Sequence, residues 1–260
     1  MTKKLSVAII SKNESLSIAE CIRSVAFADE VVVCDFGSID DTVEIAIDLG
    51  CKVYKFDDWQ GFGWAKNLAI GHCAGDWILS LDADERVTND LAVELLAVTQ
   101  SSEGLSDVFE IPRKSWFCGQ FMNYSGWRPD FVGRLFKKGA AVFSSDLVHE
   151  RLLYTGHSER LNNPLIHISF RDFDQVIEKM NRYSTASALN AVIRRPKRGG
   201  VRTAIAAGVW AFVRTYIFKR GFLDGRLGFA LAVANAEGAY YRYIKLWFAF
   251  RTKEQAESPE

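Results

Sequence analysis

DWILSLDADE, at residues 76–85, places two carboxylates directly after a run of apolar side chains. The run Asp76–Leu81 predicts a buried strand, and Asp82 and Asp84 follow at its carboxyl end. In open α/β sheets this end of a strand faces the crevice that binds ligands. A hard divalent cation, held by one or two carboxylates and by diphosphate oxygens, requires such an arrangement. Taken alone, an acidic triplet ending at Glu85 is also typical of a solvated turn.

Strands and helices alternate through the residues around this stretch. Apolar, β-branched runs predict buried strands at 5–10, 30–35 and 52–56. Helical spacing and capping residues predict helices at 15–26, 40–49 and 63–73. This alternation predicts an α/β fold with a mostly parallel central sheet, right-handed crossovers and flanking helices.

The second half of the chain follows a different pattern. Short apolar runs separated by Gly and aromatic residues predict strands at 108–111, 134–136 and 141–143, which extend the sheet and form the far wall of a cleft. A helix is predicted at 174–193, followed by a linker at 196–200 and by further helices to about Phe250.

Charge is unevenly distributed, although the chain has 32 basic and 32 acidic residues. Residues 194–253 contain 13 Lys and Arg and only two acids, Asp224 and Glu237, with aromatic side chains throughout. We therefore divide the chain into a catalytic domain, 1–193, and a basic, aromatic helical appendage, 194–260. This composition favours helices that lie in a membrane interface. A helical subdomain packed on the catalytic core or on a second subunit is the alternative, and the acidic body disfavours nucleic acid.

The cysteines and the apolar runs indicate where the protein works. The five cysteines are widely spaced without a CxxC pair, which is typical of free thiols in a reducing cytosol. The N-terminal apolar run is too short for a signal peptide. The longest apolar stretch of the appendage, Ala204–Val213, is about half of the ~20 residues that span a bilayer. We expect a cytoplasmic protein without a transmembrane helix.

A second polar motif follows the strand predicted at 30–35. Asp35 stands at the strand end, Gly37-Ser38 come next, and a helix begins near Asp40. This order suits a site for a nucleotide base or ribose, and a simple N-capped turn is the alternative. The chain has neither GxGxxG nor GxxxxGK[ST], which disfavours a dinucleotide site and excludes a P-loop.

Together these pieces resemble glycosyltransferase family two. The matching residues are Lys12-Asn13-Glu14, Asp35–Thr42, Gly61–Asn67 and Leu81–Glu85, and Phe36 stands where the family more often has a small polar residue. The resemblance spans about residues 1–170. Three further motifs are similar to a subgroup, the bacterial lipopolysaccharide-core β-1,4-glucosyltransferases, which act on an inner-core heptose: Asp57–Gly63, Val148-His149-Glu150 and Gly221–Gly225.

The resemblance implies a GT-A-type fold, with a nucleotide-sugar-binding half at 1–100 and an acceptor half at 101–193. It implies a Mg²⁺ or Mn²⁺ ion bound by Asp84 with Asp82, which also lies at the ribose and diphosphate side. Asp35 would contact the uracil, and Lys66 would lie near the donor. The nucleotide-sugar site would then comprise Asn13, Glu14, Asp35, Gly37, Ser38, Lys66 and Asp82.

An inverting transfer also requires a general base beside the acceptor hydroxyl. The candidates are Asp146 and Glu150, and we favour Glu150 because it matches the subgroup's Val-His-Glu. The alternative for Glu150 is an ion pair with Arg151 or another cation. His167 is either a neighbour of the metal and diphosphate or a core histidine.

The acceptor is expected to meet the stretch 116–128 and His149. Trp127 and Arg128 are the main candidates, beside Trp116 and Tyr124, because aromatic rings stack on sugars and Arg suits an acceptor phosphate. Ordinary packing and a surface cation are the alternatives for these residues, and a structural histidine is the alternative for His149.

The sequence therefore predicts an inverting, metal-dependent glycosyltransferase. It would move a hexose, glucose by the resemblance, from a UDP-sugar to a lipid-linked saccharide at the cytoplasmic face of the inner membrane. Two other functions stay open: a sugar nucleotidyltransferase, which would need a Gly-rich basic loop in place of Ser11–Glu14, and a non-catalytic, membrane-associated carbohydrate-binding module. The oligomeric state is left open.

Overall fold

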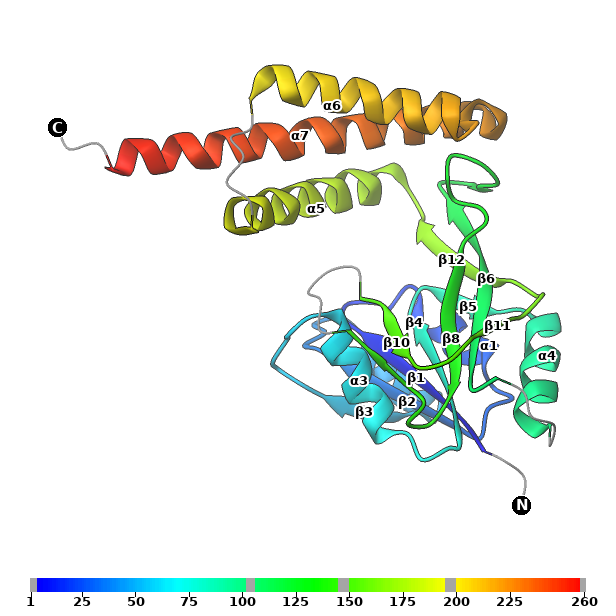
Figure 1. Cartoon of the computed structure of the whole chain (residues 1–260). Helices are drawn as coiled ribbons and strands as arrows, with labels where there is room; N and C mark the ends of the chain where they lie inside the picture. The colour runs from blue at the N-terminus through cyan, green and yellow to red at the C-terminus, as the bar shows by residue number, and fades with distance from the viewer. Residues whose placement is uncertain (1–3, 102–105, 145–149, 195–199, 258–260) are drawn as a thin grey trace. The chain divides into compact units, whose positions relative to one another are not determined.

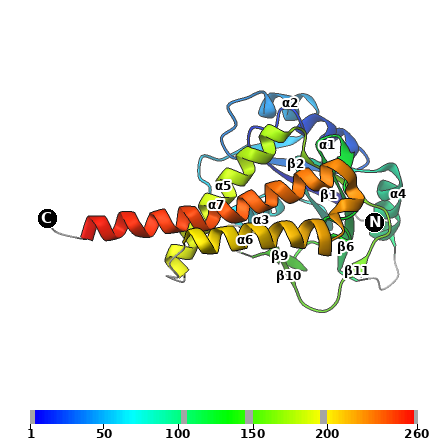
Figure 2. The same ribbon diagram turned by 90° about the horizontal axis from the view of Figure 1, so that it is seen from above.

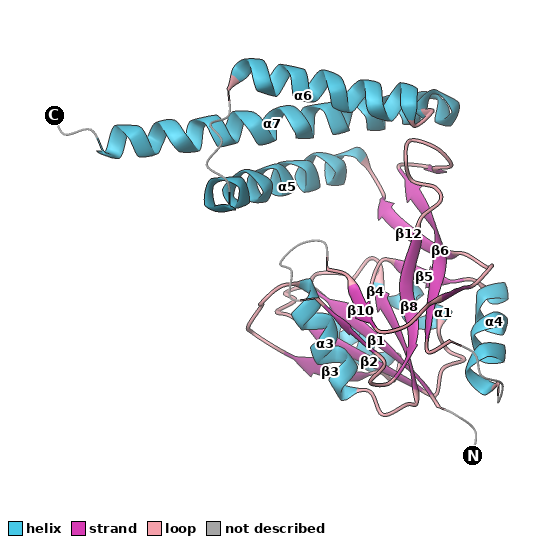
Figure 3. Cartoon of the chain, in the orientation of Figure 1, coloured by secondary structure: helices cyan, strands magenta, loops and turns pink. Residues whose placement is uncertain are grey.

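The computed structural model describes residues 4–101, 106–144, 150–194 and 200–257 (Figures 1 and 3). The chain divides into two compact units. The first comprises Met1–Lys114 and Pro129–Ile168, and the second comprises Ser115–Arg128 and Ser169–Glu260. Each unit therefore combines segments that are far apart in the sequence.

Four parallel strands form one half of the sheet in the first unit. Their order is β3 (Lys52–Lys55), β2 (Glu30–Asp35), β1 (Leu5–Ser11) and β4 (Trp77–Asp82). β1 pairs with both neighbours, which sets Ser11 beside Asp35 and Ile10 beside Asp82. All of β1 is buried, as in a central strand that is covered on both faces. The predicted parallel sheet is confirmed, and the carboxyl ends of β1, β2 and β4 meet at one edge.

Antiparallel strands continue the sheet beyond β4. β8 (Phe131–Lys137) pairs with β4, and β6 (Val108–Phe117) pairs with β8. β12 (Leu165–Phe170) follows in the strand order and pairs with β5 (Glu85–Val87), which sets His167 opposite Glu85. The short strand β11 (Glu159–Arg160) pairs with β6. β9 (Ala141–Phe143) and β10 (Leu152–Tyr154) form a separate two-stranded sheet.

Alternate residues of β1 enter two apolar cores, because successive side chains of a strand point to opposite faces. Leu5, Val7 and Ile9 belong to a core that includes side chains of α1 (Ile18–Ser24), α2 (Thr42–Asp48) and α4 (Asn89–Gln100). Ala8 and Ile10 belong to the other core, which includes side chains of α3 (Phe62–His72). Helices on both faces thus bury the sheet and leave its carboxyl edge for polar side chains.

The second unit is built on three long helices. α5 (Phe173–Arg194) and α6 (Val201–Val213) both pack along α7 (Gly225–Glu257), and a π-helical turn η1 (Arg214–Phe218) and a 3₁₀ turn η2 (Gly221–Asp224) join α6 to α7 (Figures 1 and 2). Residues 174–193 were assigned to the catalytic domain from the sequence. The compact units group α5 with α6 and α7, and Val176 of α5 shares an apolar cluster with Leu231 and Ala234 of α7. Among the described residues, no helix has both the length and the hydropathy to cross a bilayer.

Asp224 connects the two chain segments of this second unit. Its buried carboxylate accepts hydrogen bonds from the backbone N–H of Asn123 at 3.0 Å and of Tyr124 at 3.1 Å, and from the Ser125 hydroxyl at 2.8 Å. The loop that bears Asp224's partners follows β7 (Gln120–Phe121), which pairs with the end of β6. The motif Gly221–Gly225 therefore fixes the stretch 123–125 by direct hydrogen bonds.

The Glu30 carboxylate forms hydrogen bonds with three separate segments of the first unit. Its carboxylate accepts hydrogen bonds from the Ser6 hydroxyl, from Lys52 Nζ at 2.6 Å and from the backbone N–H of Ala74 at 2.8 Å. Burial alone would raise the pKa of Glu30, but the Ala74 N–H, Lys52 and Ser6 outweigh it and lower the pKa from 4.5 to about 2. Ionised Glu30 therefore stabilises the fold above pH 4.5, and this contribution is lost as the pH falls toward 2.

Glu30→Gln is expected to lower the free energy of unfolding by about 1–3 kcal/mol at pH 7, because it removes hydrogen bonds to a charged group. Urea unfolding at pH 7, 5 and 3 measures the difference between wild type and variant, which should be constant above pH 4.5 and shrink below it. Glu44→Gln, at an exposed position of α2, is the control. A difference that stays the same down to pH 3 would contradict the depressed pKa.

Candidate active site

Asp82 ends β4 between two cations. Lys66 Nζ, from α3, lies 2.8 Å from Asp82 Oδ1, and Arg134 Nη2, from β8, contacts Asp82 Oδ2. Burial would raise the pKa of Asp82, but the charges of Arg134 and Lys66 outweigh it and hold the pKa well below its usual range. Asp82 is therefore ionised at neutral pH, and both of its carboxylate oxygens are engaged by the protein.

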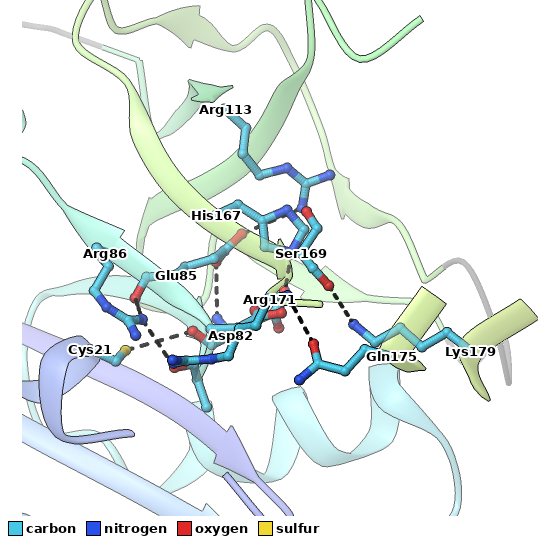
Figure 4. A network of polar contacts seen from close by, with 12 residues as sticks. Cys21, Asp82, Glu85, Arg86, Arg113, His167, Ser169, Arg171, Gln175 and Lys179 are labelled. Carbon is cyan, nitrogen blue, oxygen red and sulfur yellow. Dashed lines mark hydrogen bonds and ion pairs between the residues drawn. The ribbon is translucent and has the colours of Figure 1, made fainter. Parts of the chain in front are cut away.

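Glu85 is a buried carboxylate that supports the same strand end. It accepts a hydrogen bond from Arg134 Nη2 at 2.6 Å. Figure 4 shows Glu85 with Asp82, whose backbone N–H donates to it at 3.0 Å, and with Arg113, whose Nη1 lies 3.5 Å away. Burial would lower the pKa of Arg134, but Asp82 and Glu85 outweigh it and raise the pKa. The acidic triplet is thus not a solvated turn, because Glu85 is buried in an ion pair with Arg134, which also contacts Asp82.

Lys66 also connects Asp82 to Glu150. Lys66 Nζ lies 2.8 Å from Glu150 Oε1, and the lysine is buried. The close approach of α3 to the chain before Glu150 depends on Gly63, where a Cβ would lie 1.8 Å from the carbonyl oxygen of Ser144. Of the two alternatives for Glu150, the ion pair is present, and its partner is Lys66. The pair also brings Glu150 to the strand end that bears Asp82.

Asp84 lies beside His167. His167 Nε2 is 3.3 Å from Asp84 Oδ2, and the backbone N–H of Ile168 donates to the carbonyl oxygen of Asp84 at 2.9 Å. Both side chains are partly exposed. A carboxylate and an imidazole within hydrogen-bond distance can ligate one divalent cation, and diphosphate oxygens can complete its coordination. The described residues contain no group of three or more His, Cys, Asp or Glu side chains placed to hold a metal ion.

The second predicted motif forms a hydrogen-bonded junction with the loop after β1. Asp35 is buried, and its carboxylate accepts hydrogen bonds from the Ser11 hydroxyl at 3.0 Å and from the backbone N–H of Ser38 at 2.9 Å. The Ser38 hydroxyl in turn accepts from the Asn13 N–H at 2.8 Å, and Asn13 Oδ1 accepts from the Ile39 N–H at 2.9 Å. Asp35 therefore organises the loop, whose exposed residues include Asn13 and Gly37.

Other contacts surround this junction. The Glu14 N–H donates to the Thr42 hydroxyl at 2.8 Å, which joins the two loops a second time. Phe36, the departure from the family's usual residue, is buried and packs against three aromatic rings: Phe56 at 5.5 Å, Trp59 at 5.1 Å and Trp64 at 5.8 Å. The large side chain at position 36 therefore forms part of an aromatic cluster next to the loop.

The remaining predicted residues are not brought to this edge by the described contacts. Asp146 and His149 lie outside the described residues. Trp127 and Arg128 belong to the second unit, where Trp127 packs edge-on against Phe117 at 5.7 Å and Arg128 Nη1 donates to Asn123 Oδ1 at 3.1 Å. Sequence reasoning missed Arg134, Glu85 and Arg113. The only signal for Arg134 was a cation inside an otherwise apolar strand pattern.

The chain is similar to known glycosyltransferases in sequence. The model of glycosyl transferase family 2 matches residues 6–143. The chain is 31% identical to an uncharacterized glycosyltransferase of Rickettsia prowazekii, over 94% of this chain and 87% of the relative. It is 28% identical to the lipopolysaccharide core biosynthesis glycosyltransferase LpsC of Rhizobium meliloti, over 94% of this chain and 92% of that one. It is 27% identical to glucosyl-3-phosphoglycerate synthase of Mycobacterium tuberculosis, solved with Mn²⁺, UDP and glucosyl-3-phosphoglycerate, over 44% of each chain with a TM-score of 0.36.

Proposed function

The chain belongs to glycosyl transferase family 2, and we propose that it moves glucose from UDP-glucose to a lipid-linked saccharide, such as an inner-core heptose of lipopolysaccharide, with inversion at the anomeric carbon. The observation that carries the proposal is the group of side chains at the end of β4. Asp82 and Lys66 join Glu150 there, and Asp84, just after the strand end, lies beside His167 of β12. A nucleophilic displacement on a nucleotide sugar needs an anchored donor, neutralised diphosphate and a base, and this group contains residue types for each task.

The metal would be held by Asp84, with His167 as the second protein ligand. The pair fits a divalent cation by its chemistry and its 3.3 Å separation. Because Lys66 and Arg134 already engage both oxygens of Asp82, Asp84 is the better ligand of the two predicted aspartates. When bound, Mg²⁺ or Mn²⁺ would neutralise the charge that develops on the departing diphosphate.

The protein's own residues would carry the rest of the reaction. Lys66 lies between Asp82 and Glu150 and would add a positive charge on the donor side. Glu150 would take the proton of the acceptor hydroxyl while that oxygen bonds to the anomeric carbon and the carbon–diphosphate bond breaks. A single displacement needs only one carboxylate of this kind, because no covalent intermediate forms. The loop bearing Asn13, Gly37 and Ser38 would hold the nucleoside.

The acceptor and the location of the enzyme follow from other features. The relative LpsC acts in lipopolysaccharide core biosynthesis by its name, which supports a saccharide acceptor on a lipid. The basic, aromatic helices of the second unit would keep the enzyme on the cytoplasmic face of the inner membrane, where such an acceptor is built. Family membership favours glycosyl transfer over nucleotidyl transfer and over carbohydrate binding without catalysis.

The test is UDP release from a panel of UDP-sugars in the presence of Mg²⁺ or Mn²⁺, with a chelator control. We expect slow hydrolysis that is fastest with UDP-glucose, and no release in excess chelator. Release from another UDP-sugar alone would reject glucose as the donor. Pyrophosphate formation from UTP and a sugar 1-phosphate would indicate a nucleotidyltransferase, and sugar binding without either reaction would indicate a binding module.

A further inference from the structure

The last turn of α6 and the turn that joins it to α7 carry a concentration of exposed apolar side chains. Phe218 is 67% exposed, Trp210 is 57% exposed, and their rings lie 5.8 Å apart. Val209 of α6 and Ile217, Phe222 and Leu223 of the turn are also exposed, and these six residues are called the apolar tip. Such a gathering of exposed apolar residues on a folded protein marks an interaction surface.

The backbone of the apolar tip is closely packed within the second unit. A Cβ at Gly221 would lie 2.8 Å from the carbonyl oxygen of Thr215, and one at Gly228 would lie 2.0 Å from the carbonyl oxygen of Gly221. Asp224 adds hydrogen bonds to Tyr124 and Ser125. The fold therefore holds this turn in one conformation with its apolar side chains outward, and their exposure is not that of a loose chain end.

The charges around the apolar tip have one sign. The exposed cations of this region are Arg214, Lys219, Arg220 and Arg226. Between residues 201 and 226 the single acid is Asp224, which is buried. A symmetric dimer through this surface would set the same cations against one another, and such like-charge contacts are unfavourable. Anionic headgroups would meet the cations favourably, while aromatic and aliphatic side chains suit the boundary below the headgroups.

We propose that the apolar tip inserts into the headgroup boundary of an anionic bilayer, with Trp210 and Phe218 entering the apolar layer and the surrounding cations on lipid phosphates. Membrane insertion rests on the proposed function in one respect, because a lipid-linked acceptor would lie at such a surface. Membrane binding is thereby assigned to the end of α6 and the α6–α7 turn rather than to the whole length of the basic helices.

The test is co-sedimentation of the full-length protein with vesicles of phosphatidylglycerol and phosphatidylcholine, and with vesicles of phosphatidylcholine alone. Wild type should bind the anionic vesicles more tightly, and this binding should weaken between 0.1 and 1 M salt as the Debye length falls from about 10 to about 3 Å. The double variant W210S/F218S should bind at least about tenfold more weakly, since two large apolar side chains are lost. K219Q/R226Q should lose about fivefold or more per cation on anionic vesicles only.

The control is Val93→Ser on α4, an apolar side chain that is 70% exposed and far from this turn in sequence, and it should bind like wild type. Thermal unfolding checks that all variants fold. Equal vesicle binding by W210S/F218S and wild type overturns the proposal, as does wild type that binds neither kind of vesicle. A double variant that loses self-association in sedimentation velocity, with vesicle binding unchanged, would also overturn it and identify an interface between copies. Hydrolysis of a soluble UDP-sugar separates the two proposals, because its absence in wild type counts against the proposed function alone.

Discussion

Asp84→Ala is expected to abolish turnover, a loss of about 10³-fold or more, while the protein stays folded. Asp84 lies 3.3 Å from His167, is partly exposed and belongs to neither apolar core, so its removal leaves the packing of β4 and β5 intact. The diphosphate that leaves the sugar carries growing negative charge, and without a bound cation this charge is unmatched. Each 1.36 kcal/mol of lost transition-state stabilisation lowers the rate about tenfold, so several kcal/mol gives the predicted loss.

The measurement is UDP release at saturating donor and metal, together with Mn²⁺ titration followed by the thermal stability of the protein with UDP. Asp76→Ala is the matched control, because Asp76 stands at the opposite end of the same strand, where it accepts a hydrogen bond from the Lys4 N–H at 3.0 Å. We expect Asp76→Ala to retain turnover and the metal-dependent stabilisation, and Asp84→Ala to lose both. Full activity of Asp84→Ala, or of wild type in excess chelator, would reject the metal-dependent mechanism.

The GT-A-type α/β fold with a C-terminal helical region was predictable because its strongest signals are local. The strands at residues 5–11, 30–35 and 77–82 are mostly apolar, and such runs are typical of buried parallel strands whatever their partners. The helix α4 was missed although a signal existed. Thr88 caps it by accepting a hydrogen bond from the Leu91 N–H at 3.2 Å, and Leu91 and Leu95 have helical spacing.

The partners of the site residues were not predictable, because antiparallel pairings between distant segments bring them together. Arg134 reaches Asp82 only through the pairing of β8 with β4, and His167 reaches Asp84 only because β12 pairs with β5. These contacts join residues that are far apart in the sequence, since Arg134 is 52 positions from Asp82 and 49 positions from Glu85. The sequence predicts Glu85 only as part of an acidic turn. In the structure its buried carboxylate forms an ion pair with Arg134.

The boundary between the compact units differs from the change in composition along the chain. Composition changes at residue 194, where the basic, aromatic region begins, and the sequence analysis set its boundary there. Packing follows apolar surface rather than charge, so α5 joins α7 although α5 lacks the basic character of the later helices. The stretch 115–128 joins the same unit through β7 and the hydrogen bonds of Asp224, and nothing in its local pattern indicates this.

Glu150→Gln is expected to lower turnover by about 10²-fold or more with little change in the dissociation constant of UDP. Gln keeps the shape of Glu and can still accept a hydrogen bond from Lys66 Nζ, which lies 2.8 Å from Glu150 Oε1, but it no longer accepts a proton from the acceptor. Turnover is measured as sugar transfer to a saccharide acceptor, and UDP binding is measured by calorimetry. Asp146→Asn is measured in the same two assays for comparison with Glu150→Gln. Inactivity of Asp146→Asn together with an active Glu150→Gln would reassign the base.

The contact with Lys66 offers a second role for Glu150, the neutralisation of that buried cation. Glu150→Gln separates this role from that of the base. If Glu150 only neutralises Lys66, the substitution leaves that buried cation with Asp82 as its remaining carboxylate partner among the contacts described, and the effect falls on donor binding. The dissociation constant of UDP would then change while turnover at saturating donor is retained. If Glu150 is the base, turnover falls while UDP binding persists. The anomeric configuration of the product tests both, since a retained configuration would exclude a single displacement assisted by either carboxylate.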